Sequence, residues 1–511
     1  MRPEASPTGK AQRSLKAEAA AGAMWVTLEM AMVQLTSFCV LIVMTRFVSL
    51  RDFGLISISF LATQSLKYVL LDNVAAAIVR KRQASDEDYS TAFWISLALS
   101  ALGCLTLYTG ADWCERLFAA DGLAPVLRAM SGVVLVMGLS RTHEMWLIRH
   151  FRFRALALRG GIAALAGGAV GVALAVFGAG VMALVGQQVI SSLAAAALMW
   201  VVCPWRPGIR VSKTAAREIV AFFRGASGNA LAYVVNQHCD TFLVALFFGS
   251  TSAGVYNVGK RLRLALLFVV ATPINSITLP LLAEVQHQEA RLRNGMRTAL
   301  TLISTVCAPV FLGVAAVAPD IIALLLAPQW VEAGPILAWL AAGAPLLILL
   351  TWNDNLFFVA NRPAWVSYLS LLYSALAILV FFALLVIGTG SPAMAFVLPA
   401  LVVLPLSAWL TTRLLPWRGR DWVAAVLPGF AAALVMFVAV KLLAANLQGI
   451  GTVLRLVILV GCGALAYGAM LLLVGRAAAH CVFELLSEVW RYRRDTGSGS
   501  LSFLSSPTNP S

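Results

Sequence analysis

Charged residues are scarce in this sequence. Only 12% of the 511 residues are Asp, Glu, Lys or Arg, whereas 60% are hydrophobic, and the mean hydropathy is +0.86. A soluble domain cannot bury that much apolar surface in its core. The composition therefore excludes a soluble globular protein and indicates a chain that lies largely in a membrane.

Motifs for catalysis and for cofactor binding are also missing. The eight cysteines show no metal-ligand spacing, and most of them lie in or beside apolar stretches as packing residues. No loop carries a nucleophile elbow, a zinc motif or a carboxylate pair. The run from Gly254 to Gly259 and Lys260 resembles a phosphate-binding loop, but Arg261 replaces the Ser or Thr that would hold magnesium. We therefore expect no catalytic site, no metal and no cofactor.

Fourteen apolar stretches fill the chain instead. About 20 apolar residues cross a bilayer core of roughly 30 Å as a helix, and a backbone in hydrocarbon must satisfy its own hydrogen bonds. The sequence thus predicts an all-α polytopic membrane protein, with transport as the first functional hypothesis. The predicted spans are 23–45, 53–79, 91–110, 124–147, 156–177, 179–202, 226–249, 252–280, 295–317, 332–359, 364–388, 391–413, 422–446 and 452–474.

Basic residues alternate between the gaps. If residue 1 is cytoplasmic, 27 Lys and Arg fall in cytoplasmic segments and three in the opposite loops. Such a bias sets the orientation of membrane helices, so both termini are predicted to be cytoplasmic. The net charge of +15 would suggest nucleic acid in a soluble protein, but here it is spread through loops. We expect no nucleic-acid partner.

The chain also resembles itself at an offset of 200 residues. Residues 45–58 (TRFVSLRDFGLISI) align without a gap on 245–258 (ALFFGSTSAGVYNV), and the alignment matches Phe47 with Phe247 and Gly54 with Gly254. Six spans separate the copies, so both keep the same orientation, and parallel repeats place a cavity between two lobes. Chance similarity among Gly- and Leu-rich helices is the alternative.

This repeat predicts a division of the chain into lobes and tails. Two six-helix lobes are followed by two extra helices. The predicted parts are a cytoplasmic tail (1–20), an N-lobe with helices 1–6 (21–205), a cytoplasmic inter-lobe loop (206–225), a C-lobe with helices 7–12 (226–415), helices 13 and 14 (416–475), and a cytoplasmic tail, amphipathic and then disordered (476–511).

A polar stripe runs along the seventh span. Asn229, Tyr233, Asn236 and Asp240 fall at i, i+4, i+7 and i+11, which is one helical face. Hydrogen bonds between helices are one explanation, but a carboxylate on the same stripe favours a cavity wall. We expect the first three to contact substrate and Asp240 to exchange an ion. Alternatively, Asp240 braces the hairpin between spans 7 and 8.

Cations lie within the membrane as well. Tyr256, Lys260 and Arg263 share a face of span 8, and the matching face of span 2 carries Lys67. Snorkelling to the surface is the alternative. Converging cations suit a phosphate or pyrophosphate, so the three cations are predicted to bind the substrate. Glu29 in span 1 is a second candidate for ion coupling.

Two further carboxylates, Glu144 in span 4 and Asp354 in span 10, occupy similar positions in the two halves. Structural salt bridges explain them as well as function does. Arg141, for example, stands three residues before Glu144, a spacing that pairs side chains on a helix.

The order and spacing of several motifs bring a family into view. They are DTFLVALFFGSTSAGVYNVGKRL (240–262), INSITLPLLAEVQ (274–286), TRFVSLRDFGL (45–55), IRHFRFR (148–154), FGAGVMALVGQQV (177–189) and ANRP (360–363). Over about residues 20–420 the chain resembles the bacterial polysaccharide transporter family of lipid-linked oligosaccharide flippases, most closely its exopolysaccharide and colanic-acid branch.

The resemblance implies the fold of the multidrug/oligosaccharidyl-lipid/polysaccharide exporter superfamily, with two lobes that alternate access. It implies an inner-membrane flippase that moves a polyprenyl-pyrophosphate-linked repeat unit to the periplasmic leaflet. The implied partners are this lipid-linked oligosaccharide, membrane lipids, and the polysaccharide polymerase and export machinery.

Two other functions compete with the flippase. A cation-coupled multidrug exporter of the same superfamily would need an acidic cavity, whereas Lys and Arg would repel cationic drugs. A membrane-embedded glycan transferase would need acid and base groups in a surface loop, and the sequence has none there.

Overall fold

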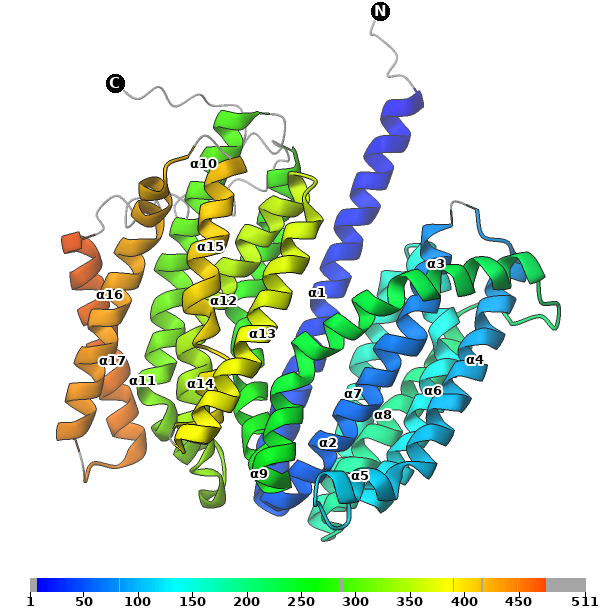
Figure 1. The fold of residues 1–511 in the computed structure, drawn as a ribbon, viewed down its shortest axis with the longest axis horizontal. Helices are drawn as coiled ribbons and strands as arrows, with labels where there is room; N and C mark the ends of the chain where they lie inside the picture. Colours follow the sequence, from blue (N-terminus) through cyan, green and yellow to red (C-terminus); the bar gives the residue numbers. More distant parts are fainter. Residues whose placement is uncertain are drawn as a thin grey trace, which may run out of the picture. The chain divides into compact units, whose positions relative to one another are not determined.

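The structure is a computed structural model that describes residues 7–474 except 82, 285–287, 389, 415–416 and 448; side chains at 7–21, 23, 272–284 and 289 are not described. Within this part of the chain every regular element is a helix, which confirms the predicted all-α class (Figure 1). The amphipathic helix predicted within 477–494 lies outside the described residues.

The helices follow one another with short connections. In order they are α1 (Pro7–Phe47), α2 (Leu50–Leu66), the π-helical turn η1 (Lys67–Leu71), α3 (Asp72–Arg80), α4 (Asp86–Thr109), α5 (Ala111–Leu117), α6 (Leu123–Arg149), α7 (Phe153–Val176), α8 (Val181–Val202), α9 (Lys213–Glu284), α10 (Glu289–Leu302), the π-helical turn η2 (Ile303–Cys307), α11 (Ala308–Leu325), the 3-10 turn η3 (Pro328–Trp330), α12 (Ala333–Val359), α13 (Pro363–Ile387), α14 (Pro392–Ala395), α15 (Pro399–Leu414), α16 (Gly419–Asn446) and α17 (Thr452–Val474).

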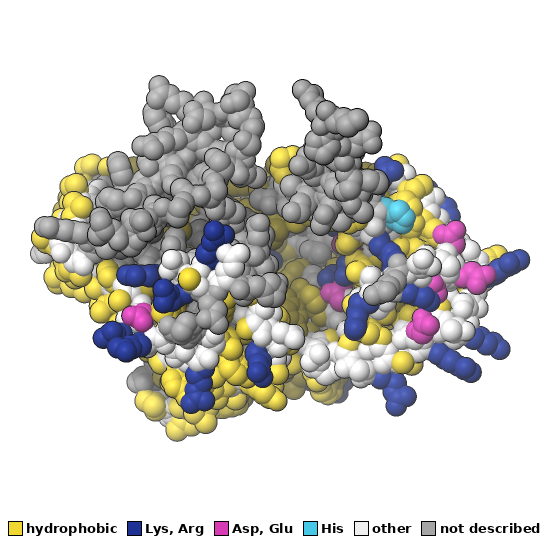
Figure 2. Space-filling view, turned by 90° about the horizontal axis from the view of Figure 1, so that it is seen from above, with side chains coloured by type: hydrophobic (Ala, Val, Ile, Leu, Met, Phe, Trp, Pro, Cys, Tyr) yellow, Lys and Arg dark blue, Asp and Glu magenta, His cyan; other side chains and the backbone are white. Residues whose placement is uncertain are grey.

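The predicted spans match these helices closely. Among the described residues, 13 helical segments are long and apolar enough to cross a membrane. One of them, in α9, holds two predicted spans, because Gly249 breaks its helical backbone at φ 81° and ψ 175°. Many large apolar side chains on these helices are exposed, as lipid-facing helices require. Figure 2 shows Lys and Arg side chains scattered among hydrophobic and other side chains on the face seen from above.

Two predicted tail or loop segments are helical. α1 begins at Pro7 rather than near residue 23, because an Ala-rich stretch with high helix propensity precedes the apolar run. α9 begins at Lys213, inside the predicted loop 206–225.

The early start of α9 has a clear cause in packing. Its first turns bury Ile219 against a core of α3, α4, α6 and α8 residues, and Glu218 forms a 3.0 Å ion pair with Lys81. Hydrogen bonds from Lys81 to Asp88 and Glu218 raise the pKa of Lys81. The segment is therefore an amphipathic helix docked on the first unit, not a loop.

The chain forms two compact units. The first contains residues 1–269, 318–343 and 366–403, and the second contains 270–317, 344–365 and 404 onward. In the first, α7 packs along α1 and α8, where glycines such as Gly168 and Gly171 allow close approach. In the second, Gly429 of α16 lies against the backbone of Ser304 in η2. The predicted lobe boundaries stay a prediction.

The two copies of the predicted repeat touch at one point in the first unit. A Cβ added to Gly54 of α2 would lie 1.8 Å from the Ser250 carbonyl oxygen. A Cβ added to Gly254 of α9 would lie 2.4 Å from the Leu50 carbonyl oxygen. Residues 50 and 250 are themselves related by the offset of 200. The contact is therefore reciprocal, as between copies related by a two-fold axis, and it supports the gap-free alignment.

We predict that Gly54→Ala and Gly254→Ala each destabilise the protein. The added methyl group would meet backbone atoms, which cannot rotate away, and overpacking of this kind costs about 1–3 kcal/mol or more. Thermal unfolding of the purified protein in detergent measures the effect. Gly132→Ala in α6 is the control, because nothing lies within 4 Å of its added Cβ. Equal melting temperatures for Gly54→Ala and Gly132→Ala would contradict the contact.

Candidate functional site

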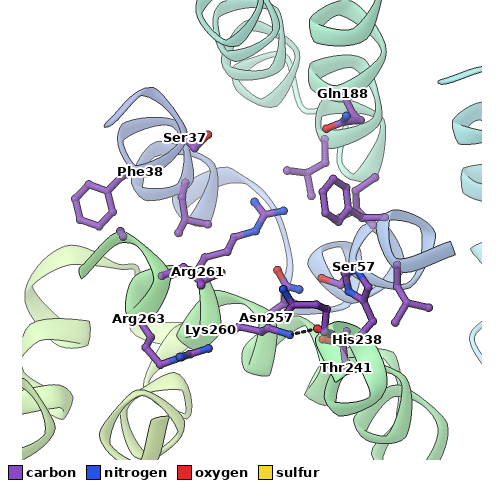
Figure 3. A pocket seen from close by; sticks show the side chains of 18 of the residues that line it. Ser37, Phe38, Ser57, Gln188, His238, Thr241, Asn257, Lys260, Arg261 and Arg263 are labelled. Carbon is purple, nitrogen blue, oxygen red and sulfur yellow. Dashed lines mark hydrogen bonds between the residues drawn. The ribbon is translucent and has the colours of Figure 1, made fainter. Parts of the chain in front are cut away.

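The first unit contains a cavity of about 420 Å³ between α1, α2, η1, α8 and α9 (Figure 3). Its lining is rich in hydrogen-bonding side chains, including Gln34, Gln187 and Gln188, and it contains three cations. Among the described residues that line the cavity, none is Asp or Glu. The cavity therefore carries an excess of positive charge.

The cavity lies across the two copies of the repeat. Six pairs of its lining residues are related by the offset of 200. In each pair the member from α9 is the more polar, and two of these α9 members are cations. The pairs are Ser37 and Gln237, Phe38 and His238, Leu41 and Thr241, Ser57 and Asn257, Phe60 and Lys260, and Leu61 and Arg261.

Lys260 lines the cavity, as predicted for a substrate ligand, but its charge is already paired. Its Nζ lies 2.6 and 2.8 Å from the two carboxylate oxygens of Asp240 and donates to the Gln237 carbonyl oxygen at 2.9 Å. These contacts use all three N–H donors of the ammonium group. Lys260 can therefore bind an anion only if it leaves Asp240.

Asp240 joins the two halves of α9. Besides Lys260, its carboxylate accepts hydrogen bonds from the Tyr256 hydroxyl at 3.0 Å and from the Thr241 backbone N–H at 2.6 Å. The Lys260 and Asp240 side chains are only 16% and 14% exposed. This geometry fits the alternative in which Asp240 braces the hairpin, and its role in ion exchange stays a prediction.

Two arginines of α9 face the cavity without a partner. Among the described residues, neither Arg261 nor Arg263 forms an ion pair or a hydrogen bond, and Nε of Arg263 is buried. Figure 3 shows the Arg261 side chain extending into the space between α1 and α8. Arg263 belongs to the predicted set, whereas Arg261 does not. Its position four residues after Asn257, on the same helical face, is the signal that could have identified it.

The predicted stripe on the first half of α9 does not line this cavity. Asn236 donates hydrogen bonds to Ser370 and Ser374 of α13 at 2.8 and 3.2 Å. These bonds match the alternative explanation of the stripe, in which its polar residues form hydrogen bonds between helices. Tyr233 packs its ring edge-on to Tyr68 at 4.8 Å, and Asn229 is exposed. The residues that line the cavity, Gln237 and Thr241, each follow a stripe residue by one position. One position corresponds to a rotation of about 100° around the helix axis, so they lie on a different face of α9.

Lys67 is also paired and does not line the cavity. Its Nζ lies 3.1 Å from the Asp72 carboxylate, five residues further along. In an α-helix residues five apart point in different directions, but the wider π-helical turn η1 brings them to one side. The π-helical turn thus gives Lys67 a carboxylate partner that an α-helical repeat does not predict.

Glu29, the second ion-coupling candidate, belongs to the same group of charges. Three cations and three carboxylates from α1, η1, α3, α6 and α7 pair in a chain, which we call the charge cluster. Its pairs are Lys67 with Asp72, Asp72 with Arg141, Arg141 with Glu144, Glu144 with Arg159, and Arg159 with Glu29. The predicted Arg141–Glu144 pair is present at 2.7 Å.

Comparison with known proteins identifies the family. A family model described as "Polysaccharide biosynthesis protein" matches residues 43–335, more than half of the chain. The chain belongs to this family. It is 24% identical over 306 residues to the succinoglycan biosynthesis transport protein ExoT of Rhizobium meliloti (strain 1021), a match covering 60% of this chain and 62% of ExoT.

A second family relative is the lipopolysaccharide biosynthesis protein WzxC of Escherichia coli (strain K12), which is 20% identical over 327 residues. This match covers 63% of the chain and 66% of WzxC. The chain thus spans less than two thirds of both relatives.

Solved structures confirm the predicted superfamily fold. The inward closed lipid II flippase MurJ matches with a TM-score of 0.69 and 14% identity, covering 86% of this chain and 96% of MurJ. An inward-facing MATE multidrug transporter of the MOP superfamily matches with a TM-score of 0.57 and 13% identity, covering 81% of this chain and 98% of that one.

We predict that Lys260 and Asp240 stabilise the protein as a pair. Lys260→Met or Asp240→Asn alone leaves a buried charge without its partner, which costs about 3–5 kcal/mol. The double variant removes both charges and should lose much less than the sum of the two single losses. Thermal unfolding of the four proteins measures this coupling. Additive losses would show that the two side chains do not interact.

Proposed function

We propose that this protein is a flippase that moves a polyprenyl-diphosphate-linked oligosaccharide repeat unit from the cytoplasmic to the periplasmic leaflet by alternating access. The observation that carries the proposal is a pair of arginines that have no ion-pair or hydrogen-bond partner among the described residues, in a cavity whose described lining residues include no carboxylate. Charged side chains at membrane depth are costly unless a partner neutralises them. A diphosphate supplies that partner and accepts the forked hydrogen bonds of guanidinium groups.

The family supports the same substrate class. ExoT is named as a transport protein of succinoglycan biosynthesis, and MurJ is named as a lipid II flippase. Multidrug transporters share the fold, but the positive charge of this cavity would repel a cationic drug. A membrane-embedded glycan transferase would need acid and base groups, and the described lining residues include no Asp or Glu. After transfer, the polysaccharide polymerase and export machinery would take up the repeat unit.

The proposed roles of the side chains follow from their pairing. Arg261 and Arg263 would bind the diphosphate directly. Lys260 would join them when it leaves Asp240, and this exchange is the step at which Asp240 could take up a proton. Lys67 and Glu29 would act through the charge cluster rather than by contact with the substrate.

We predict that Arg261→Gln and Arg263→Gln each lower transport about 10- to 100-fold, since a hydrogen bond to a charged group contributes about 1.5–3 kcal/mol. Flipping of a fluorescent polyprenyl-diphosphate saccharide in proteoliposomes measures the rate. Arg217→Gln is the matched control, because Arg217 is exposed and lies outside the cavity. Normal flipping by the Arg261→Gln, Arg263→Gln double variant would exclude these residues from the mechanism.

The proposal includes a location in the bacterial inner membrane with both termini cytoplasmic. Phe177 and Ile209 are 86% and 91% exposed in the connections before α8 and before α9. In a cysteine-free background, Phe177→Cys should react with an impermeant thiol reagent from the periplasm, whereas Ile209→Cys should react only after the inner membrane is permeabilised. The reverse pattern would contradict the orientation.

A further inference from the structure

We propose that Gln34, Gln187 and Gln188 bind the sugar that is joined directly to the diphosphate, so that these three glutamines select glycosylated carriers over the bare carrier lipid. The inference rests on the proposed function. It names the part of the substrate, the first sugar, by which the cavity would distinguish one lipid from the other. The arginines cannot make this distinction, because a diphosphate is present in both lipids.

The three amides are available for a ligand. Gln34 comes from α1, and Gln187 and Gln188 come from α8. They are half-buried, and none of them has a hydrogen-bond partner among the described residues. A carboxamide offers two donors and one acceptor group, which matches the mixed donor and acceptor character of sugar hydroxyls. Three such groups in one cavity lining are more than an apolar ligand requires.

The position of Gln187 is fixed by close helix packing. A Cβ added to Gly171 of α7 would lie 2.6 Å from the Gln187 Cβ. A glycine there lets α7 and α8 approach closely, so the start of the Gln187 side chain is held in place while the residue still lines the cavity. Such preorganisation lowers the entropic cost of binding a polar ligand.

The two repeat-related walls give the ligand one orientation. Lys260 and Arg261 lie on α9, whereas the residues related to them by the repeat, Phe60 and Leu61, are apolar. The diphosphate must therefore lie against α9. Figure 3 shows Gln188 on α8, on the side of the cavity toward which Arg261 extends. The sugar next to the diphosphate would then meet the amides of α1 and α8.

The cavity volume sets how much of the glycan is recognised. Pockets of roughly 300–1,000 Å³ hold one drug-sized ligand. At about 420 Å³, the cavity lies within this range and has room for a diphosphate with its first sugar. In this conformation the protein would distinguish carriers by the sugar next to the diphosphate.

The test compares binding of undecaprenyl diphosphate with binding of undecaprenyl diphosphate glucose to the purified protein. The wild type should bind the glycosylated lipid on the order of 10-fold more tightly, given a few neutral hydrogen bonds. The triple variant Gln34→Leu, Gln187→Leu, Gln188→Leu should lose this preference and keep its affinity for undecaprenyl diphosphate. Gln64→Leu is the control, because Gln64 of α2 does not line the cavity.

A second variant tests the orientation. Leu61→Arg combined with Arg261→Leu keeps the net charge but moves one guanidinium group to the repeat-related position. It should still bind undecaprenyl diphosphate but lose most of the preference for the glycosylated lipid. If the triple variant fails to fold, this swap and the single variants Gln34→Leu and Gln188→Leu decide the question.

The outcomes separate the inference from the proposed function. Equal affinity of the wild type for both lipids would overturn the inference and leave the flippase standing, as would a preference that survives in the triple variant or in the swap. Loss of undecaprenyl diphosphate binding in the triple variant would also overturn it, because the amides would then serve the diphosphate. If the wild type binds neither lipid, the proposed function itself fails.

Discussion

The backbone contact between Gly54 and Gly254 positions the α2 and α9 walls of the cavity relative to each other. It holds the beginning of α2 against the beginning of the second half of α9, at a distance that no larger residue allows. Arg261 and its repeat partner Leu61 each lie seven residues further along, about 10 Å at 1.5 Å per residue. The α2 and α9 walls of the cavity therefore face each other because Gly54 and Gly254 have no side chains.

Charge pairing, rather than charge alone, distinguishes the candidate site residues from the other charged residues of these helices. The charge cluster balances three cations with three carboxylates, and Lys260 is balanced by Asp240. A membrane interior makes such balance necessary, because an unpaired ion there has neither water nor a counter-ion. Arg261 and Arg263 depart from this rule in the described part of the chain, and they do so beside a cavity. In the proposed function, the substrate diphosphate is their partner.

The helices and the repeat could be predicted from sequence because both depend on local pattern: apolar runs of membrane length, and a glycine shared at a fixed offset. The pairing of charges could not. Asp240 and Lys260 are 20 residues apart and meet only because Gly249 reverses the chain. The pairing of Lys67 with Asp72 could not be anticipated, because an α-helical repeat does not bring residues five apart to one side as the π-helical turn does. The three glutamines gave no signal, since they stand within apolar spans and only tertiary packing brings α1 and α8 to one cavity.

The two halves of the repeat have kept their backbone contact and diverged in the side chains that surround it. A cavity with identical walls would offer a diphosphate two equivalent positions, and a lipid-linked ligand could then enter in two orientations. Placing Lys260 and Arg261 opposite Phe60 and Leu61 removes one of these positions. The two walls differ in charge, and this difference acts on the diphosphate at short range in a medium of low dielectric constant. The preference of the diphosphate for the α9 wall is therefore strong. A single bound orientation in turn lets fixed amides on other helices contact the same part of every ligand. The proposed recognition of the sugar would therefore depend on the asymmetry of charge, and the asymmetry would have this effect only because the glycine contact keeps the two walls face to face.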